Sequence, residues 1–178
     1  MRNTIIYAVI VVVWGNLQAL ALALLLNMKL KARGAFRTIF YIPALFSTIV
    51  VAFIWSYVYA PYYGMLYEGI GENLNLLGST STALIAVAFV ETWKTSGTMT
   101  IIYLAGLQNI PEEVMESARI DGCSAWQSTI RVKIPMLANT ITINVMLGLI
   151  NGFKSFDYVF ALTGGGPGTS SSTLMYSI

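Results

Sequence analysis

Residues 4–26 read TIIYAVIVVVWGNLQALALALLL, a nearly unbroken apolar run of the length that a helix needs to cross a bilayer. Three further runs of this kind follow at residues 38–60, 82–107 and 135–153. Only the third contains charged residues well inside it, Glu91 and Lys94. The sequence therefore predicts an all-α membrane protein, a polytopic transmembrane helix bundle with about four spans.

The composition supports the same class. Ten Lys or Arg and eight Asp or Glu make up 10% of the 178 residues, whereas 56% are hydrophobic. A soluble domain usually carries about 25% charged residues, so an ordinary soluble domain and a disordered chain are both excluded. The net charge of +2 gives no sign of a nucleic-acid-binding surface. Histidine is absent and Cys123 is the only cysteine, which excludes disulfide scaffolds, Cys/His zinc sites and His-based catalytic triads. We expect no metal site and no cofactor.

The basic residues orient the chain, because cytoplasmic loops of membrane proteins carry an excess of Lys and Arg. The loop between the second and third runs has Glu68 and Glu72 but no basic residue. The loops after the first and third runs hold most of the basic residues: Lys29, Lys31, Arg33, Arg37, Arg119, Arg131 and Lys133. We therefore expect these two loops in the cytoplasm, with the amino terminus and residues 153–178 outside.

This orientation predicts that the chain is part of a longer protein. A chain that starts outside without a signal peptide usually has an upstream span, and residues 173–178 turn apolar again before the sequence stops. We expect one additional span on each side. The alternatives are a natural four-span protein and a cleaved signal peptide at the first run.

The loop at residues 108–134 contains four of the eight acidic residues. Pro111 suits the first position of a helix, where its missing N–H costs nothing, and Gly122 suits the turn that ends it after about Ile120. A second short helix can begin near Ser124. The loop is thus predicted to be a short helix–turn–helix on the cytoplasmic face.

The side chains of this loop are those of a docking element. Ser117, Ala118 and Gly122 are small enough to allow close approach of another protein. Glu116 and Asp121 offer carboxylates to basic groups on such a partner. The alternative is an ordinary surface loop whose charges are merely solvated.

The stretch at residues 104–137, LAGLQNIPEEVMESARIDGCSAWQSTIRVKIPML, resembles the EAA loop of ABC-importer permeases. The residues that match this pattern are Glu116, Ser117, Ala118, Gly122, Val132, Ile134 and Pro135. Ser117 and Cys123 stand where the pattern usually has Ala. The subfamily that it resembles most is the carbohydrate-uptake, maltose-type group. Further matches to that group are Asn3-Thr4, Phe36-Arg37, Pro43, Trp93, Phe156-Asp157 and residues 162–167.

The resemblance implies that residues 1–178 are part of the transmembrane domain of a permease in a bacterial or archaeal inner membrane. In such permeases the EAA loop forms a coupling helix held in a cleft of a separate ATP-binding subunit. The implied partners are two ATP-binding cassette subunits, a second permease subunit, an extracytoplasmic solute-binding protein and membrane lipid. The implied docking residues are Glu116, Ser117, Ala118, Asp121 and Gly122.

This chain has no GxxxxGK[ST] phosphate-binding loop. It is therefore expected to be a transport subunit and not an enzyme, with ATP hydrolysis on another protein. The expected function is a translocation path for a sugar or related polyol.

The run at residues 135–153 carries a polar stripe that extends to Ser155. Thr140, Asn144, Gly148, Asn151 and Ser155 are spaced by three or four residues and share one helical face. In a membrane such a stripe faces protein or a watery cavity. The candidates for the substrate path are Asn144, Gly148, Asn151, Gly152 and Ser155. The alternative is helix–helix packing with interhelical hydrogen bonds.

A different class of transporter is the main alternative function. Glu91 and Lys94 can pair with one another at i, i+3, either in a lumen or as a buried structural pair. They are also the only intramembrane ionisable residues on which an ion-coupled secondary transporter or channel could run. A purely structural scaffold leaves the pattern of residues 116–135 unexplained.

Overall fold

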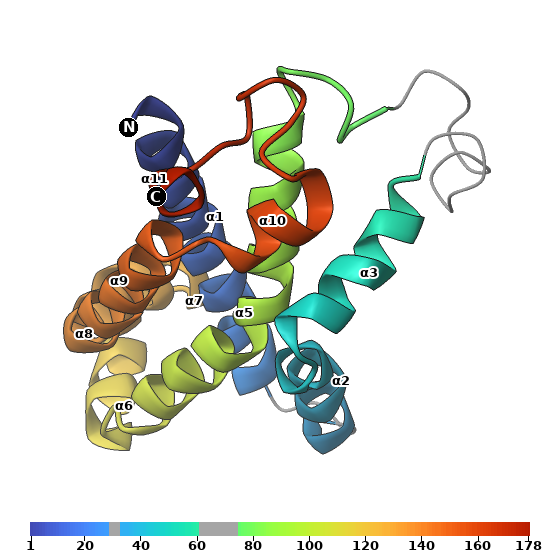
Figure 1. Cartoon of the computed structure of the whole chain (residues 1–178). Coiled ribbons are helices and arrows are strands. Elements are labelled where there is room, and N and C mark those ends of the chain that lie inside the picture. The colour runs from blue at the N-terminus through green and yellow to red at the C-terminus, as the bar shows by residue number, and fades with distance from the viewer. Residues whose placement is uncertain (29–32, 61–74) are drawn as a thin grey trace.

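The computed structural model describes residues 1–28, 33–60 and 75–178, and within these ranges the chain is built from helices and connecting turns (Figure 1). Lys29, Lys31, Glu68 and Glu72, which were used above to orient the chain, lie outside the described residues. The predicted all-α class is confirmed. The elements are α1 Arg2–Asn27, α2 Arg33–Leu45, α3 Thr48–Val58, α5 Ala83–Gln108, α6 Glu112–Ile120, α7 Ala125–Ser128, the π-helical η1 Thr129–Lys133, α8 Ile134–Met136, α9 Ala138–Phe153, α10 Asp157–Thr163 and α11 Leu174–Ser177.

The centre of the bundle is the pair α1 and α5, which lie side by side along most of their length (Figure 1). Helix α9 packs against both, and α2 packs on another side of α5. Helix α10 packs on α3 and α5 and closes one end of the bundle, which the charge pattern predicts to face outside and which is termed the outer end. The amino and carboxyl termini lie together at this end, opposite α6 (Figure 1).

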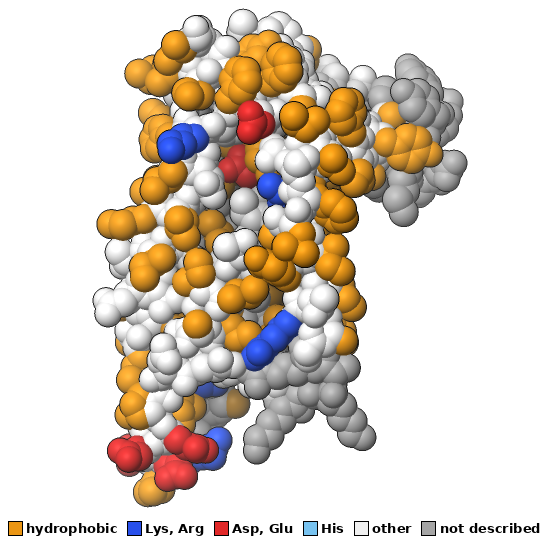
Figure 2. Space-filling model, turned by 60° about the horizontal axis from the view of Figure 1, so that its bottom comes forward, with side chains coloured by type: hydrophobic (Ala, Val, Ile, Leu, Met, Phe, Trp, Pro, Cys, Tyr) orange, Lys and Arg blue, Asp and Glu red, His pale blue; other side chains and the backbone are white. Residues whose placement is uncertain are grey.

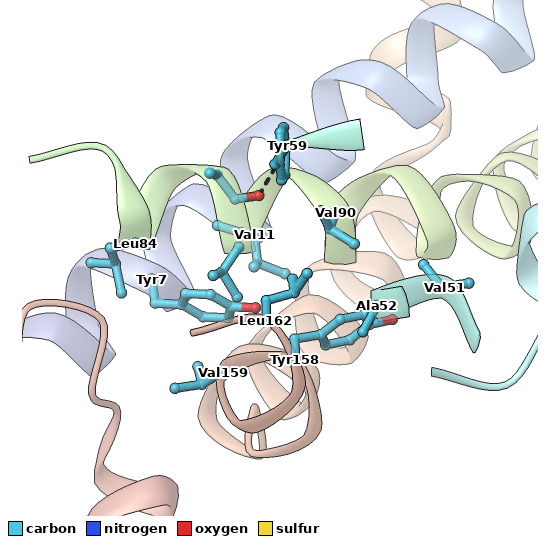
Figure 3. Close-up of a cluster of buried hydrophobic side chains, with 13 residues drawn as sticks. Tyr7, Val11, Val51, Ala52, Tyr59, Leu84, Val90, Tyr158, Val159 and Leu162 are labelled. Carbon is cyan, nitrogen blue, oxygen red and sulfur yellow. Dashed lines mark hydrogen bonds between the residues drawn. The ribbon is translucent and has the colours of Figure 1, made fainter. Parts of the chain in front are cut away.

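Two apolar clusters hold these helices together. One cluster joins α1, α3, α5 and α10 and is drawn in Figure 3, where Tyr7 points toward Leu162 and the ring of Tyr158 points toward Ala52. Tyr59 closes its edge by donating a hydrogen bond of 3.4 Å to the carbonyl of Ala86 (Figure 3). The second cluster lies nearer α6 and contains Ala19, Ala23, Leu26, Met99, Tyr103, Leu104, Leu107 and Leu137.

Small residues set how closely the helices approach. A Cβ added to Gly152 on α9 would lie 2.8 Å from the Cα of Ala8 on α1. A Cβ added to Gly97 on α5 would lie 2.5 Å from the carbonyl oxygen of Phe40 on α2. Both values are below any ordinary contact distance, so the two backbones touch only because glycine has no side chain. This is the usual way in which helices associate in membranes, where small residues let backbones meet.

The runs at 38–60 and 135–153, which were predicted to be single spans, are not single straight helices. The first is broken between α2 and α3 by a bend of 99°. Pro43 cannot donate a backbone hydrogen bond near the end of α2, and Ser47 caps the new helix by accepting 3.3 Å from the Val50 N–H. In the second, Ala125–Met136 and Ala138–Phe153 meet at 69°, just after Pro135.

Among the described helices, α1 is long and apolar enough to cross a membrane alone, and each bent pair qualifies as one broken span. Helix α5 has 26 residues, about 39 Å at 1.5 Å per residue, which is also sufficient length. Its polar centre keeps its mean hydropathy lower, but most of that helix is buried by its neighbours. A helix enclosed by protein need not be apolar on every face, so α5 can still cross the membrane. The number of four spans stays a prediction.

Candidate functional site

A polar cavity of about 240 Å³ lies near the outer end of the bundle, where four elements converge. Figure 2 shows acidic and basic side chains close together in a hollow of an otherwise largely apolar upper face. The bend before α3 brings in Thr48, the centre of α5 contributes the predicted polar residues, and the end of α9 leads into α10. The lining residues are Thr48, Glu91, Lys94, Thr95, Asn151, Lys154, Ser155, Phe156, Asp157 and Tyr158.

Glu91 and Lys94 each bond to a hydroxyl rather than to one another. The buried carboxylate of Glu91 accepts a hydrogen bond from the hydroxyl of Tyr7 on α1. The Lys94 ammonium donates 3.2 Å to the hydroxyl of Thr48 at the start of α3. No salt bridge joins the two ions in the described part of the chain. Each hydroxyl offsets part of the cost of placing an ion inside the bundle, and together these bonds tie α5 to α1 and to α3.

The structure divides the predicted substrate-path residues into two groups. Asn151 and Ser155 line the polar cavity. Asn144, Gly148 and Gly152 are instead buried between α9 and the α1–α5 pair. Asn144 donates 3.3 Å to the carbonyl of Met99 on α5. This second group thus lies where the alternative prediction of helix packing placed it.

Sequence reasoning missed Tyr7, which bonds to Glu91, and several residues that line the cavity. Tyr7 holds Glu91 from 84 positions away in the chain, and Thr48 reaches the cavity only because α2 and α3 are bent. Lys154 and Asp157 lie on either side of Phe156, directly after the apolar run at 135–153. Two opposite charges at this position could have indicated a polar site. Tyr158 enters with α10 and carries no such signal.

The loop at residues 108–134, which is predicted to be cytoplasmic, has the predicted helix–turn–helix form. Helix α6 ends at Ile120, and Gly122 adopts φ +75°, the left-handed conformation that favours glycine. Ser124 and Gln127 form a reciprocal cap, with N–H to side-chain distances of 2.9 and 3.3 Å. One detail of the prediction was wrong: Pro111 is the cap residue, and the helix begins at Glu112.

The predicted docking residues occupy two faces of this loop. Glu116, Ser117, Asp121 and Gly122 are exposed, whereas Ala118 is 7% exposed. The backbone carbonyl of Ala118 accepts 3.0 Å from the Cys123 N–H, so this residue helps to close the turn. Figure 2 shows the acidic side chains gathered at the lower end of the molecule. Beside them Ile120 and Trp126 are 86% and 72% exposed, an apolar pair that sequence reasoning did not single out.

The outer end is held by contacts between the two ends of the chain. The Asn3 amide donates to the carbonyls of Thr169, Ser170 and Ser172, at 3.0, 3.0 and 3.2 Å. The Leu174 N–H donates 2.9 Å to the hydroxyl of Thr4. These contacts attach the glycine-rich segment 164–173 to the first turn of α1.

We expect Asn3→Ala to loosen this segment, because three carbonyls lose a shared donor. The amides of Ser170 and Ser172, which bond within the segment, should exchange with solvent about fivefold faster, since one hydrogen bond contributes about 1 kcal/mol. Hydrogen exchange followed by mass spectrometry measures this. Ile5→Ala, at an exposed position of the same helix turn, is the control. Equal exchange in Asn3→Ala and the unchanged protein would contradict the proposed tether.

Comparisons with known proteins show the family of this chain. The family described as "Binding-protein-dependent transport system inner membrane component" matches residues 5–178. A probable starch degradation products transport system permease protein of Thermoanaerobacterium thermosulfurigenes is 32% identical over 174 residues, which cover 97% of this chain and 60% of that protein. A trehalose/maltose transport system permease protein of Thermococcus litoralis is 34% identical over 175 residues, covering 96% of this chain and 59% of that protein.

A solved structure shows the same fold. A chain of a bacterial alginate ABC transporter, in complex with an alginate pentasaccharide-bound periplasmic protein, superposes with a TM-score of 0.84 at 25% identity. The match covers 100% of this chain and 62% of that chain. This chain thus spans about 60% of the length of the relatives it matches. From the family match over residues 5–178 and these relatives, the chain belongs to the inner membrane components of binding-protein-dependent transport systems.

Proposed function

We propose that this chain belongs to a permease subunit that imports a saccharide or related polyol with energy from ATP hydrolysed on separate subunits. The observation that carries the proposal is a continuous connection. The exposed α6 turn leads directly into α5 on one side and, through η1 and α8, into α9 on the other. Both α5 and α9 line the polar cavity. The partners are two ATP-binding subunits, a second permease subunit and an extracytoplasmic solute-binding protein.

The geometry suits mechanical coupling. A capped helix with a defined turn moves as a unit, whereas an irregular loop would absorb the displacement. When an ATP-binding subunit moves α6, the movement passes to α5 and α9, and hence to Glu91, Lys94 and Asn151 at the cavity. Such bundles switch between two packed arrangements rather than deforming continuously, so a shift of α6 can change the side from which the cavity is open.

The cavity chemistry suits hydroxyl-rich solutes. Lys94, Lys154 and Asn151 provide donors, Glu91 and Asp157 provide acceptors, and Phe156 adds an aromatic face. A sugar both donates and accepts hydrogen bonds through its hydroxyls and presents an apolar face to aromatic rings. The names of relatives that transport trehalose, maltose or starch degradation products support this class of substrate.

Reconstitution of the complete transporter tests the function. The full-length permease, its partner permease, the ATP-binding subunits and the solute-binding protein are placed in liposomes, and uptake of maltose and trehalose is measured. We expect uptake with ATP and none with a non-hydrolysable analogue. Uptake that follows a proton gradient and ignores ATP would instead support the ion-coupled transporter.

A substitution at the cavity tests the substrate path. Asn151→Ala removes one donor and acceptor, so the KM for uptake should rise about fivefold, the effect of one neutral hydrogen bond. Asn139→Ala, at an exposed position near the other end of α9, is the matched control and should leave KM unchanged. If both variants take up maltose and trehalose with unchanged KM, Asn151 is not on the path.

A further inference from the structure

A second cavity, of about 560 Å³, lies between α6 and the inner ends of the long helices. It shares no residue with the polar cavity near the outer end. Met28 after α1, Leu107 at the end of α5 and Met115 on α6 give it an apolar side. Arg119 on α6 and Lys133 on η1 give it a cationic side, with Glu112 at the start of α6 as the one acidic lining residue.

The side of α6 that faces this cavity differs from the side proposed to meet the ATP-binding subunit. Glu112, Met115 and Arg119 are three and four residues apart, so they share one helical face. Glu116, the residue proposed to meet the ATP-binding subunit, is exposed and does not line this cavity. Helix α6 makes only sparse contacts with the other described helices, so the cavity intervenes between it and the bundle core.

The charges that line this cavity are not neutralised within the described residues. Neither Arg119 nor Lys133 makes a hydrogen bond or ion pair there with another described residue, and Glu112 makes none. The net lining charge is positive. Because α1 ends at this level and the two loops that adjoin it hold most of the Lys and Arg of the chain, the cavity is expected at the cytoplasmic surface of the membrane. Basic pockets between helices at this surface suit the head groups of anionic lipids.

We propose that this cavity binds the phosphate of an anionic phospholipid. The guanidinium of Arg119 and the ammonium of Lys133 hold the phosphate, since Arg presents a fork of donors that matches phosphate oxygens. The apolar side, Met28, Leu107 and Met115, contacts the upper acyl chain. Glu112 can accept from a head-group hydroxyl such as that of phosphatidylglycerol. A lipid in this position supports α6 from the side of the membrane, which makes the coupling helix stiffer.

Lipid binding to the complete, purified transporter tests this proposal. The complex is delipidated in detergent and titrated with phosphatidylglycerol or phosphatidylcholine, and retained lipid is measured by native mass spectrometry. We expect phosphatidylglycerol to bind about tenfold more tightly, and Arg119→Gln with Lys133→Gln to remove this preference, because each cation near the surface contributes to anionic-lipid attraction. Arg131→Gln is the matched control: Arg131 is exposed on the same η1 turn but does not line the cavity.

Further arms keep the outcome decisive. Arg119→Lys preserves the charge and should keep most of the preference for phosphatidylglycerol. Loss of this preference in Arg119→Lys as well as in the double variant would indicate a folding defect rather than the loss of charge. Soluble glycerol 3-phosphate should compete only weakly, since it has no acyl chain. Equal binding of this compound and of phosphatidylglycerol, or full lipid retention in the double variant, would overturn the proposal. Because the readout is binding, it is independent of whether the transporter proves to use ATP.

Discussion

Gly152→Ala is expected to destabilise the bundle by about 2–3 kcal/mol, the cost of forcing a methyl group into a packed interface. The new Cβ would lie 2.8 Å from the Cα of Ala8 and 3.0 Å from its Cβ. Neither atom belongs to a flexible side chain, so α1 and α9 must move apart. Helix association in a membrane relies on such packing because lipid chains are as apolar as the side chains. Separation of these helices therefore loses contacts along both.

Thermal unfolding of the purified permease in detergent measures this effect. A loss of this size corresponds to a fall in Tm of about 5–10 °C. Gly148→Ala should cost less, because its nearest neighbour is the end of the Val12 side chain at 3.2 Å. Gly34→Ala is the control, since no atom of the described residues packs within 4 Å of the added Cβ. If Gly152→Ala unfolds at the same temperature as Gly34→Ala, the close contact of α1 and α9 is wrong.

Glu116→Lys is expected to reduce association with the ATP-binding subunits about 30-fold or more, if Glu116 meets a basic residue as proposed. Reversing one member of a desolvated charge pair typically costs 2–5 kcal/mol. Glu116 is exposed on α6 and makes no ion pair with another described residue, so the substitution leaves the fold of the permease intact. Co-purification of the ATP-binding subunits with the tagged, full-length permease measures the change.

Glu113→Lys provides the matched control for this charge reversal. Glu113 is also exposed, one turn earlier on the same helix. Its replacement by Lys changes the net charge by the same amount. If both variants retain the ATP-binding subunits as the unchanged permease does, α6 is not the docking element. If both lose them equally, general electrostatic attraction acts rather than a specific contact of Glu116.

The turn at Gly122 allows a graded form of the same test. Its φ of +75° is tolerated by Asn better than by Ala, and it is closed to Pro, whose ring requires a negative φ. Association should therefore weaken in the order Gly122→Asn, Gly122→Ala, Gly122→Pro. An unordered series would show that the shape of this turn is irrelevant to docking.

The cytoplasmic loop shows how far local signals reach. The end of α6, the turn at Gly122 and the start of a second helix near Ser124 were all predicted, because each depends on residues within one helical turn of it. The position of Pro111 was wrong by one residue for the same local reason: a proline suits both the cap and the first helical position. The exposure of Trp126 could not be predicted, since it depends on which helices lie behind the loop.

Such local signals could not predict two other features. These are the bend between α2 and α3 and the division of the polar stripe on α9 into two groups. Hydropathy records that residues 38–60 are apolar but not that the chain changes direction by 99°. Helical spacing places Asn144, Asn151 and Ser155 along one stripe but not the rotation of α9, which turns Asn144 toward α5 and Asn151 toward the cavity.

The sequence by itself determined the helical membrane class, the family and the local form of the coupling loop, because composition, run length and capping act over one element at a time. The tertiary structure alone decided that Tyr7 holds Glu91, that Thr48 holds Lys94 and that Asn151 and Ser155 meet them at one cavity. The physical reason is that lipid and protein interior are both apolar. Hydropathy therefore cannot indicate which face of a helix meets its neighbour, and close packing at residues such as Gly152 makes that choice.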